Sequence, residues 1–150
     1  MDATLVQELI DRDWAQFVAQ SRRLGLGAPE RSSDRIDLVV SPTGTTDRFR
    51  AVLLCDGYDA VAPALDFAEL ETGVELGKPY WPRMSAAPYN EIAYAGRRLP
   101  ILCTPGTRGY HLHPSHHAES HDKNIWRLPL QADLIARLLT RMGSYQGCGL

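Results

Sequence analysis

The chain has 150 residues, of which 44% are hydrophobic and 23% charged, and its 16 Lys and Arg against 18 Asp and Glu give a net charge of −2. This length predicts one domain, residues 1–150, that folds on its own hydrophobic core without a disulfide or a structural metal. The charge balance lacks the basic excess of a general nucleic-acid binder, and no apolar run approaches the roughly 20 residues of a membrane span. We therefore expect neither nucleic acid nor a membrane as a partner.

Apolar residues at helical spacings predict a first helix over residues 4–24, with Asp2 as its N-cap and Gly25 at its end. The expected core face of this helix consists of Leu5, Leu9, Trp14, Phe17, Val18 and Leu24. Residues 28–34 are expected to form a polar linker. Strands are predicted over residues 36–40 and 49–54, with a turn at 41–46 between them, and a third extended segment over 64–70.

The second half of the chain has weaker signals. Residues 73–98 contain prolines and aromatics that indicate an ordered irregular segment, and residues 99–102 form a short apolar run before a turn at 104–107. A second amphipathic helix is predicted over 130–142, with an apolar stripe of Leu130, Leu134, Ile135, Leu138, Leu139 and Met142. Residues 143–150 are expected to be loose. This order predicts an α+β fold, in which an N-terminal and a C-terminal helix flank a small antiparallel sheet.

The three cysteines, Cys55, Cys103 and Cys148, are odd in number and widely spaced. The first four residues carry no basic segment before an apolar one, as a secretory signal would. Both features favour reduced thiols and a cytoplasmic location. Cys103 ends an apolar run beside a Pro-Gly turn and close to histidines, which favours a reactive thiolate over the alternative of a small buried core residue. Cys55 ends a core strand and is expected to be structural.

All five histidines lie within eleven residues, and Glu119 lies among them: His111, His113, His116, His117 and His121. Imidazole, thiolate and carboxylate are the usual ligands of Zn²⁺, so this cluster and Cys103 predict a zinc site. His111 and His113 would point to the same side of an extended segment, and Pro114 blocks a helix through the cluster. The spacing matches neither paired Cys-x-x-Cys nor His-Glu-x-x-His, so a solvated histidine-rich loop remains the alternative.

The order of motifs resembles the ubiquitin-conjugating enzymes. After a first helix and strands come Tyr58-x-x-x-Ala62-Pro63-x-Leu65-x-Phe67, the segment Ile101-Leu102-Cys103, and then Trp126, Pro129 and the last helix. The resemblance implies that fold, a catalytic Cys103 that carries a ubiquitin-like protein as a thioester, and an activating enzyme as partner. Asp59 and Ala62 replace two of the family's prolines. The family's His-Pro-Asn is replaced by Ala-Tyr-Ala at 93–95, which leaves the role of its asparagine empty or to be filled by Asn90 or a histidine.

A second resemblance is to a small bacterial family of ubiquitin-like conjugation operons, which is named for a cysteine, a glutamate and two histidines and is thought to bind metal. Residues 103–117, from Cys103 through His111 and His113 to His117, look like its core. This resemblance implies that Cys103, His111 and His113 are metal ligands, and that the glutamate is either Glu91 or Glu119.

Three functional hypotheses follow. The first is a conjugating enzyme with Cys103 as nucleophile, and the second is a metal-binding adaptor of the same system with Cys103 as ligand. The third, ranked last, is a metal-dependent hydrolase with Glu119 as base. The sequence identifies neither the modifier, the acceptor nor the metal, and it leaves open a homo- or heterodimer.

Overall fold

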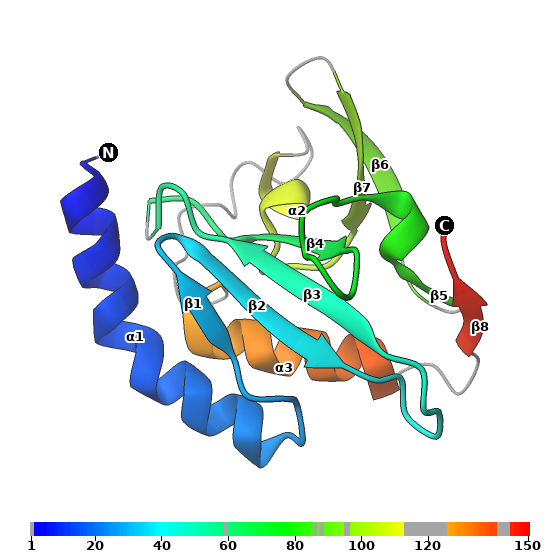
Figure 1. Cartoon of the computed structure of the whole chain (residues 1–150). Helices are drawn as coiled ribbons and strands as arrows, with labels where there is room; N and C mark the ends of the chain where they lie inside the picture. Colours follow the sequence, from blue (N-terminus) through cyan, green and yellow to red (C-terminus); the bar gives the residue numbers. More distant parts are fainter. Residues whose placement is uncertain are drawn as a thin grey trace.

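The computed structural model describes residues 2–58, 60–85, 87, 89–94, 97–112, 126–140 and 145–150. In this part of the chain a four-stranded antiparallel sheet, in the order β1-β2-β3-β4, is accompanied by two long helices, one short α-helix, a single 3-10 turn and two small two-stranded sheets (Figure 1). The mixed α+β architecture with an N-terminal and a C-terminal helix is as predicted. The elements are α1 (Ala3–Arg23), β1 (Glu30–Ser32), β2 (Arg35–Val40), β3 (Phe49–Leu54), β4 (Ala64–Ala68), η1 (Lys78–Tyr80), β5 (Pro82–Met84), β6 (Tyr89–Tyr94), β7 (Arg97–Leu102), α2 (Arg108–Leu112), α3 (Leu128–Thr140) and β8 (Tyr145–Cys148).

Helix α1 begins as predicted, because the Asp2 side chain accepts a hydrogen bond from the Thr4 amide at 2.7 Å. Its predicted core face is partly wrong. The buried residues are Val6, Ile10, Asp13, Phe17 and Ser21. Of the predicted face only Phe17 is fully buried, while Leu5 is 44% exposed. Two of the buried residues, Asp13 and Ser21, are polar, so the positions of the large apolar residues did not identify the buried face of the helix.

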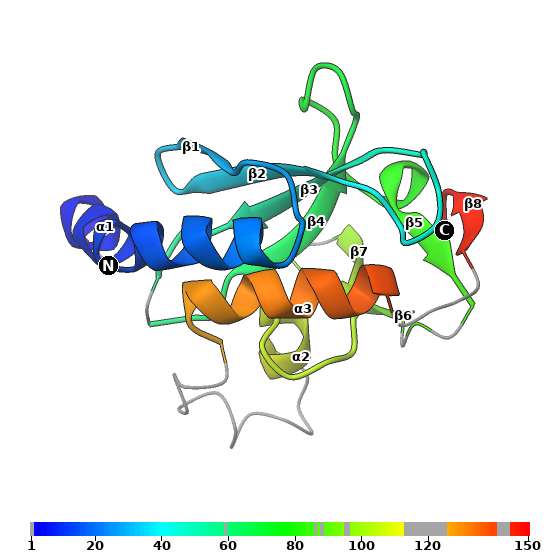
Figure 2. The same ribbon diagram turned by 90° about the horizontal axis from the view of Figure 1, so that it is seen from below.

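Both long helices cover the same face of the four-stranded sheet, where α1 and α3 lie side by side (Figure 2). Strand β2 alternates as a half-buried strand should: Ile36, Leu38 and Val40 are buried against the helices. Helix α3 contributes Leu128, Ala132, Leu134, Ile135, Leu138 and Leu139 to the same core. Its predicted stripe is confirmed at four positions, but Leu130 is 38% exposed, and Met142 lies outside the described residues.

The predicted linker at 28–34 contains a strand. Strand β1 pairs antiparallel with β2, with Glu30 opposite Asp37 and Ser32 opposite Arg35. Ser33, in the turn between them, has a φ of 55°. A polar edge strand is joined to its neighbour through backbone hydrogen bonds, so it carries no hydrophobic pattern that the sequence could show.

Strands were also missed in the second half of the chain. The segment predicted to be irregular contains β5 and β6, which pair with β8 and β7 respectively, the latter in a hairpin. The end of the chain is therefore not loose. Tyr145 of β8 packs its ring edge-on against Phe49 at 5.9 Å, and the Gly149 amide donates to the Trp81 carbonyl at 2.8 Å. These partners are about 60 to 100 positions apart in sequence, so no local pattern predicts them.

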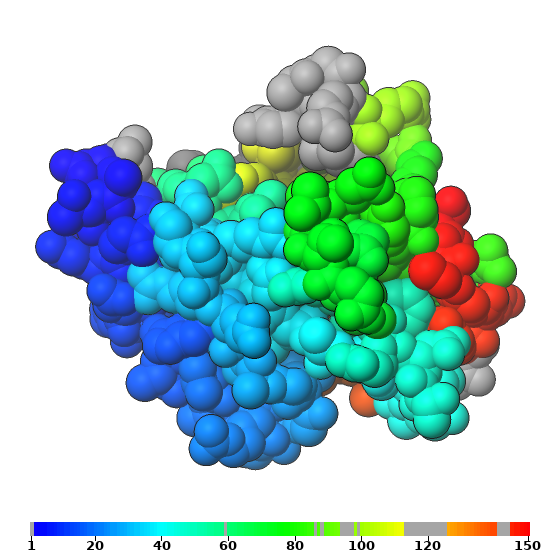
Figure 3. Space-filling model, viewed as in Figure 1, coloured from blue at the N-terminus to red at the C-terminus, as the bar shows by residue number. Residues whose placement is uncertain are grey.

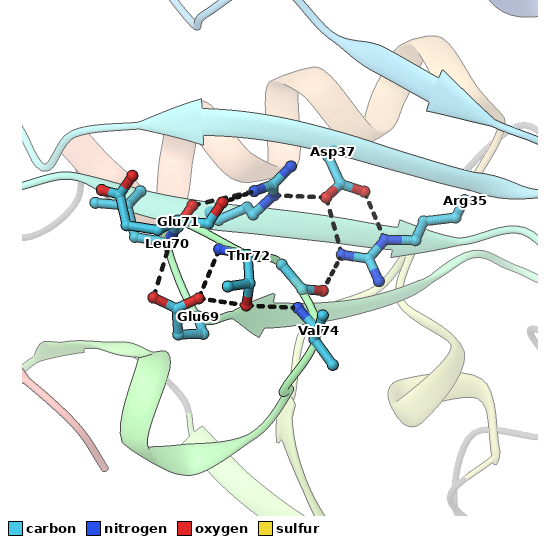
Figure 4. Close-up of polar contacts among 9 residues, drawn as sticks. Arg35, Asp37, Glu69, Leu70, Glu71, Thr72 and Val74 are labelled. Carbon is cyan, nitrogen blue, oxygen red and sulfur yellow. Dashed lines mark hydrogen bonds and ion pairs between the residues drawn. The ribbon is translucent and has the colours of Figure 1, made fainter.

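The outer face of the sheet carries an ionic network around Asp37 (Figure 4). Arg35 and Arg50 both donate to the Asp37 carboxylate, and they also donate to the carbonyls of Gly73 and Leu70, at 2.7 and 3.1 Å. Burial acts to raise the pKa of Asp37, but the two arginines outweigh it and hold that pKa below its usual value. The network fastens the segment after β4 over strands β2 and β3 (Figure 3, green over cyan).

A buried polar contact joins three parts of the core. The Tyr58 hydroxyl donates to Asp13 of α1 at 2.6 Å and accepts from the Leu128 amide at the start of α3 at 2.8 Å. Burial and the neighbouring carboxylate raise the pKa of Tyr58. Trp126 packs edge-on against the same ring. Tyr58 therefore sets where α3 begins relative to α1.

None of the helices in the described part of the chain has both the length and the apolar character that a membrane crossing requires.

Candidate functional site

The three thiols differ sharply in their surroundings. Cys55 is fully buried, and burial raises its pKa to about 12, so it stays protonated and unreactive near neutral pH. Its predicted structural role is in keeping with this burial. Cys148 is exposed on β8, and its thiol donates to the Pro79 carbonyl at 3.0 Å. Cys103 is free and half-buried, and it lies directly after β7, where the chain turns toward α2 (Figure 1).

The turn after Cys103, residues 104–107, is confirmed as predicted and is tightly held. The Thr104 amide and the Thr107 hydroxyl both donate to the Leu102 carbonyl, at 2.8 and 3.0 Å. Gly106 has a φ of 106°, a conformation that favours glycine. Its amide donates to His111 Nε2 at 3.1 Å, and its carbonyl accepts from Gln131 Nε2 at 2.8 Å. Backbone and side chains together thus fix the loop that presents the thiol.

Helix α2, which the sequence did not predict, is anchored to the sheet. The Arg108 guanidinium donates to the carbonyls of Ala62 and Leu54, at 2.9 and 3.2 Å, and pairs with Asp56 at 2.7 Å. Gly109 lies so close to β7 that a Cβ there would come within 2.4 Å of Ile101 Cγ2. The helix can therefore lie flat on β7 only because this residue is glycine.

A small, mainly apolar pocket of about 120 Å³ lies where β4, β7 and α2 meet, next to the Cys103 turn. Its aliphatic lining includes Leu65, Ile92, Leu102 and Leu112, and Arg108 lies at its edge. The pocket places an apolar surface beside the loop that carries the thiol.

His111 is the one residue of the histidine cluster that the structure describes, and it is buried. Because its Nε2 accepts the Gly106 amide, the neutral ring carries its proton on Nδ1. Ligation of Zn²⁺ by either nitrogen would require this hydrogen bond to be given up, since a ring bound through Nδ1 carries its proton on Nε2. The residues as placed therefore do not favour His111 as a ligand.

The other predicted ligands, His113, His117 and Glu119, lie outside the described residues, as do His116 and His121. Within the described ranges no three His, Cys, Asp or Glu side chains are grouped so as to hold a metal ion. Glu91, the alternative glutamate, pairs with Lys78 and with Arg98, the latter at 2.8 Å. Asn90 is exposed, and its Oδ1 accepts the Glu91 amide at 2.8 Å.

Sequence reasoning missed two residues that hold the Cys103 region, Arg108 and Gln131. Gln131 carried a readable signal, because it is a polar residue within the apolar stripe of a predicted helix. Arg108 carried none, because its partners are backbone carbonyls about fifty residues earlier in the chain.

Comparison with known proteins finds no family model that matches this chain and no curated protein with a similar sequence.

Proposed function

We propose that this protein is a ubiquitin-conjugating-enzyme-like component of a bacterial ubiquitin-like conjugation system, in which Cys103 carries the modifier as a thioester. The observation that carries the proposal is the placement of Cys103. It is a free, half-buried thiol at the end of β7, on a turn held by hydrogen bonds from α2 and α3. Of the other two thiols, Cys55 is buried in the core and Cys148 is exposed on β8.

The order of elements supports the same proposal. An N-terminal helix is followed by four consecutive antiparallel strands, by a cysteine-bearing turn and by a last helix. Tyr58, Pro63, Leu65 and Phe67, the residues of the family-like motif, lie before and within β4. Tyr58, Leu65 and Phe67 are in the core cluster, so the motif has a packing role here.

The chemistry requires two exchanges at one sulfur atom. The Cys103 thiolate attacks the thioester carbonyl that joins the modifier to the activating enzyme, so that a new C–S bond forms and the activating enzyme's thiolate leaves. An acceptor amine then attacks the new thioester, forming an amide, releasing the Cys103 thiolate and giving its proton to a base or to water. A thiolate serves both steps because it is a good nucleophile and a good leaving group.

A metal-binding adaptor, with zinc held by Cys103 and histidines, is the alternative. It would lock the sulfur as a ligand, and with His111 among those histidines it would require His111 to release Gly106. The hydrogen bond that now holds the turn counts against His111 as one of these ligands.

The test is incubation of the purified protein with ATP and with the ubiquitin-like protein and activating enzyme of the same organism. We expect an adduct that dithiothreitol removes, an adduct resistant to dithiothreitol with Cys103→Ser, and none with Cys103→Ala. Cys148→Ser is the matched control and should form the wild-type adduct. The absence of a Cys103-dependent adduct when the activating enzyme itself is charged would overturn the proposal.

A further inference from the structure

Gln131 occupies an unusual position for an amide side chain. It lies on α3 between the buried residues Leu128 and Leu134, and it is fully buried itself. Burying an amide costs free energy unless hydrogen bonds replace those made to water. A leucine here would continue the apolar stripe, so the amide calls for a specific explanation.

The Nε2 group of Gln131 has two partners. It donates to the Gly106 carbonyl at 2.8 Å and to the Trp126 carbonyl at 3.0 Å. These two acceptors fix the orientation of the amide, since the oxygen cannot face two carbonyls. The oxygen Oε1 is buried, and no donor in the described part of the chain reaches it. The contacts of the described residues therefore offset the cost of burying this amide only in part.

The hydrogen bond from Gln131 holds Gly106, a residue of the turn after Cys103. Gly106 is buried and lies three residues after Cys103, in a backbone conformation with a φ of 106°. Its amide is held by His111 of α2 and its carbonyl by Gln131 of α3. Buried side chains of two helices therefore hold both the amide and the carbonyl of this turn by hydrogen bonds.

We infer that Gln131 is a positioning residue for Cys103: it holds the Gly106 carbonyl and so fixes the loop in the arrangement from which the thiol reacts. As a contribution to thioester transfer, this inference rests on the proposed function. Its effect on the thiol itself does not, and can be measured without a modifier.

The experiment compares Gln131→Leu with the wild type. Without Nε2 the buried Gly106 carbonyl loses this donor, so we expect the turn to open toward water and the thiol to become more accessible. We expect iodoacetamide to alkylate Cys103 at least threefold faster, relative to Cys148 in the same chain, when both are followed by mass spectrometry below the unfolding temperature. Thioester formation should be at least tenfold slower. A purely structural role would lower thermal stability, but it would leave unchanged the alkylation rate of Cys103 relative to Cys148 and the rate of thioester formation.

Two further variants make the result decisive. Gln20→Leu makes the same chemical change at a contact between α1 and α3, where Gln20 donates to Asp133 at 2.9 Å. This variant should keep the wild-type alkylation ratio of Cys103 to Cys148 and the wild-type rate of thioester formation. Gly106→Ala disturbs the same turn from the other side, because alanine does not readily adopt its φ, and it should reproduce the effects of Gln131→Leu. If Gln131→Leu does not fold, Gln131→Met, which also lacks the amide but keeps the length of the side chain, takes its place.

An alkylation ratio within twofold of the wild type in a folded Gln131→Leu or Gly106→Ala variant would overturn the inference. If the wild type forms no thioester, the proposed function fails, but the alkylation ratio still decides whether Gln131 controls the exposure of Cys103.

Discussion

At the scale of single residues, this protein uses buried polar side chains as connectors between elements. Tyr58 joins α1 to α3, Gln131 joins α3 to the Cys103 turn, and Trp81 donates to Asp66 of β4 at 2.8 Å. A buried polar group is tolerated when it is hydrogen-bonded, and its directional contacts then select one arrangement of the elements. Removing such a group should cost more than removing a comparable group at the surface.

Tyr58→Phe tests this directly. The substitution keeps the ring against Trp126 but leaves the Leu128 amide without this acceptor and Asp13 without this donor. We expect the free energy of unfolding to fall by about 1–3 kcal/mol, measured by chemical denaturation. Tyr80→Phe, which removes an exposed hydroxyl that donates to Glu75, is the control and should change stability by less than about 0.5 kcal/mol. Equal effects of the two substitutions would contradict this interpretation.

The lowered pKa of Asp13 predicts how the free energy of unfolding depends on pH. The hydrogen bond from Arg12 and that from Tyr58 lower the pKa of Asp13, against the opposing effect of burial. Its folded pKa is thus below the unfolded value of about 3.9. The stability that it contributes is therefore full above that value and is lost as the pH falls through the folded pKa.

Asp13→Asn should accordingly be less stable than the wild type at pH 7, and the difference should shrink as the pH falls below the unfolded pKa of about 3.9. Chemical denaturation at a series of pH values measures it. Asp37→Asn, which removes a second carboxylate with a lowered pKa on the opposite face of the sheet, should show the same trend independently. A difference that grows on acidification would refute the assigned direction.

At the scale of elements, close packing decides where α2 lies. The helix has only five residues, so hydrogen bonds within it cannot hold it by themselves. It is held by the Arg108 contacts to the end of β3 and to the segment between β3 and β4, and by the close approach of Gly109 to Ile101. The placement of α2 in turn sets His111 against the Gly106 amide.

Gly109→Ala should push α2 away from β7, because the added Cβ would come within 2.4 Å of Ile101 Cγ2. We expect a loss of about 1–3 kcal/mol in chemical denaturation, together with faster amide hydrogen exchange in α2. Gly44→Ala is the control: it also changes glycine to alanine, at a φ of 80° with no atom near the new Cβ, and should cost only about 1 kcal/mol with no change in α2. Unchanged exchange in α2 of Gly109→Ala would show that the helix does not depend on this contact.

At the scale of the whole molecule, both long helices cover one face of the sheet, and the ionic network around Asp37 occupies the other (Figures 2 and 4). The described core is closed by aliphatic and aromatic side chains from α1, the sheet and α3. Its packing supplies the main driving force for folding.

Metal removal tests this picture of the molecule. We expect EDTA to shift the melting temperature of untagged protein by less than about 2 °C, which corresponds to a fraction of a kcal/mol for a domain of this size. The reason is that the described core is closed by apolar side chains and that His111 already holds Gly106. Near-stoichiometric zinc in the purified protein, with a large destabilisation by EDTA, would contradict this and would favour Cys103 as a ligand.

The elements with a strong local pattern could be predicted from the sequence. The long helices, strands β2 to β4 and the turn after Cys103 all follow from hydrophobic periodicity, caps and turn residues. So does the α+β class, because the order of these elements leaves few ways to bury their apolar faces. The choice of Cys103 over Cys55 as the candidate thiol also came from local context, and their difference in burial agrees with it.

Only the tertiary structure decided how distant segments meet. The pairing of β5 with β8, the buried face of α1 and the hold of Arg108 and Gln131 on the Cys103 region all depend on contacts between residues 25 or more positions apart. Such contacts are made by single polar groups or by backbone, which leave no periodic trace in the sequence. Local patterns therefore determined which segments are helices and strands, and the geometry of their packing determined which side chains surround the thiol.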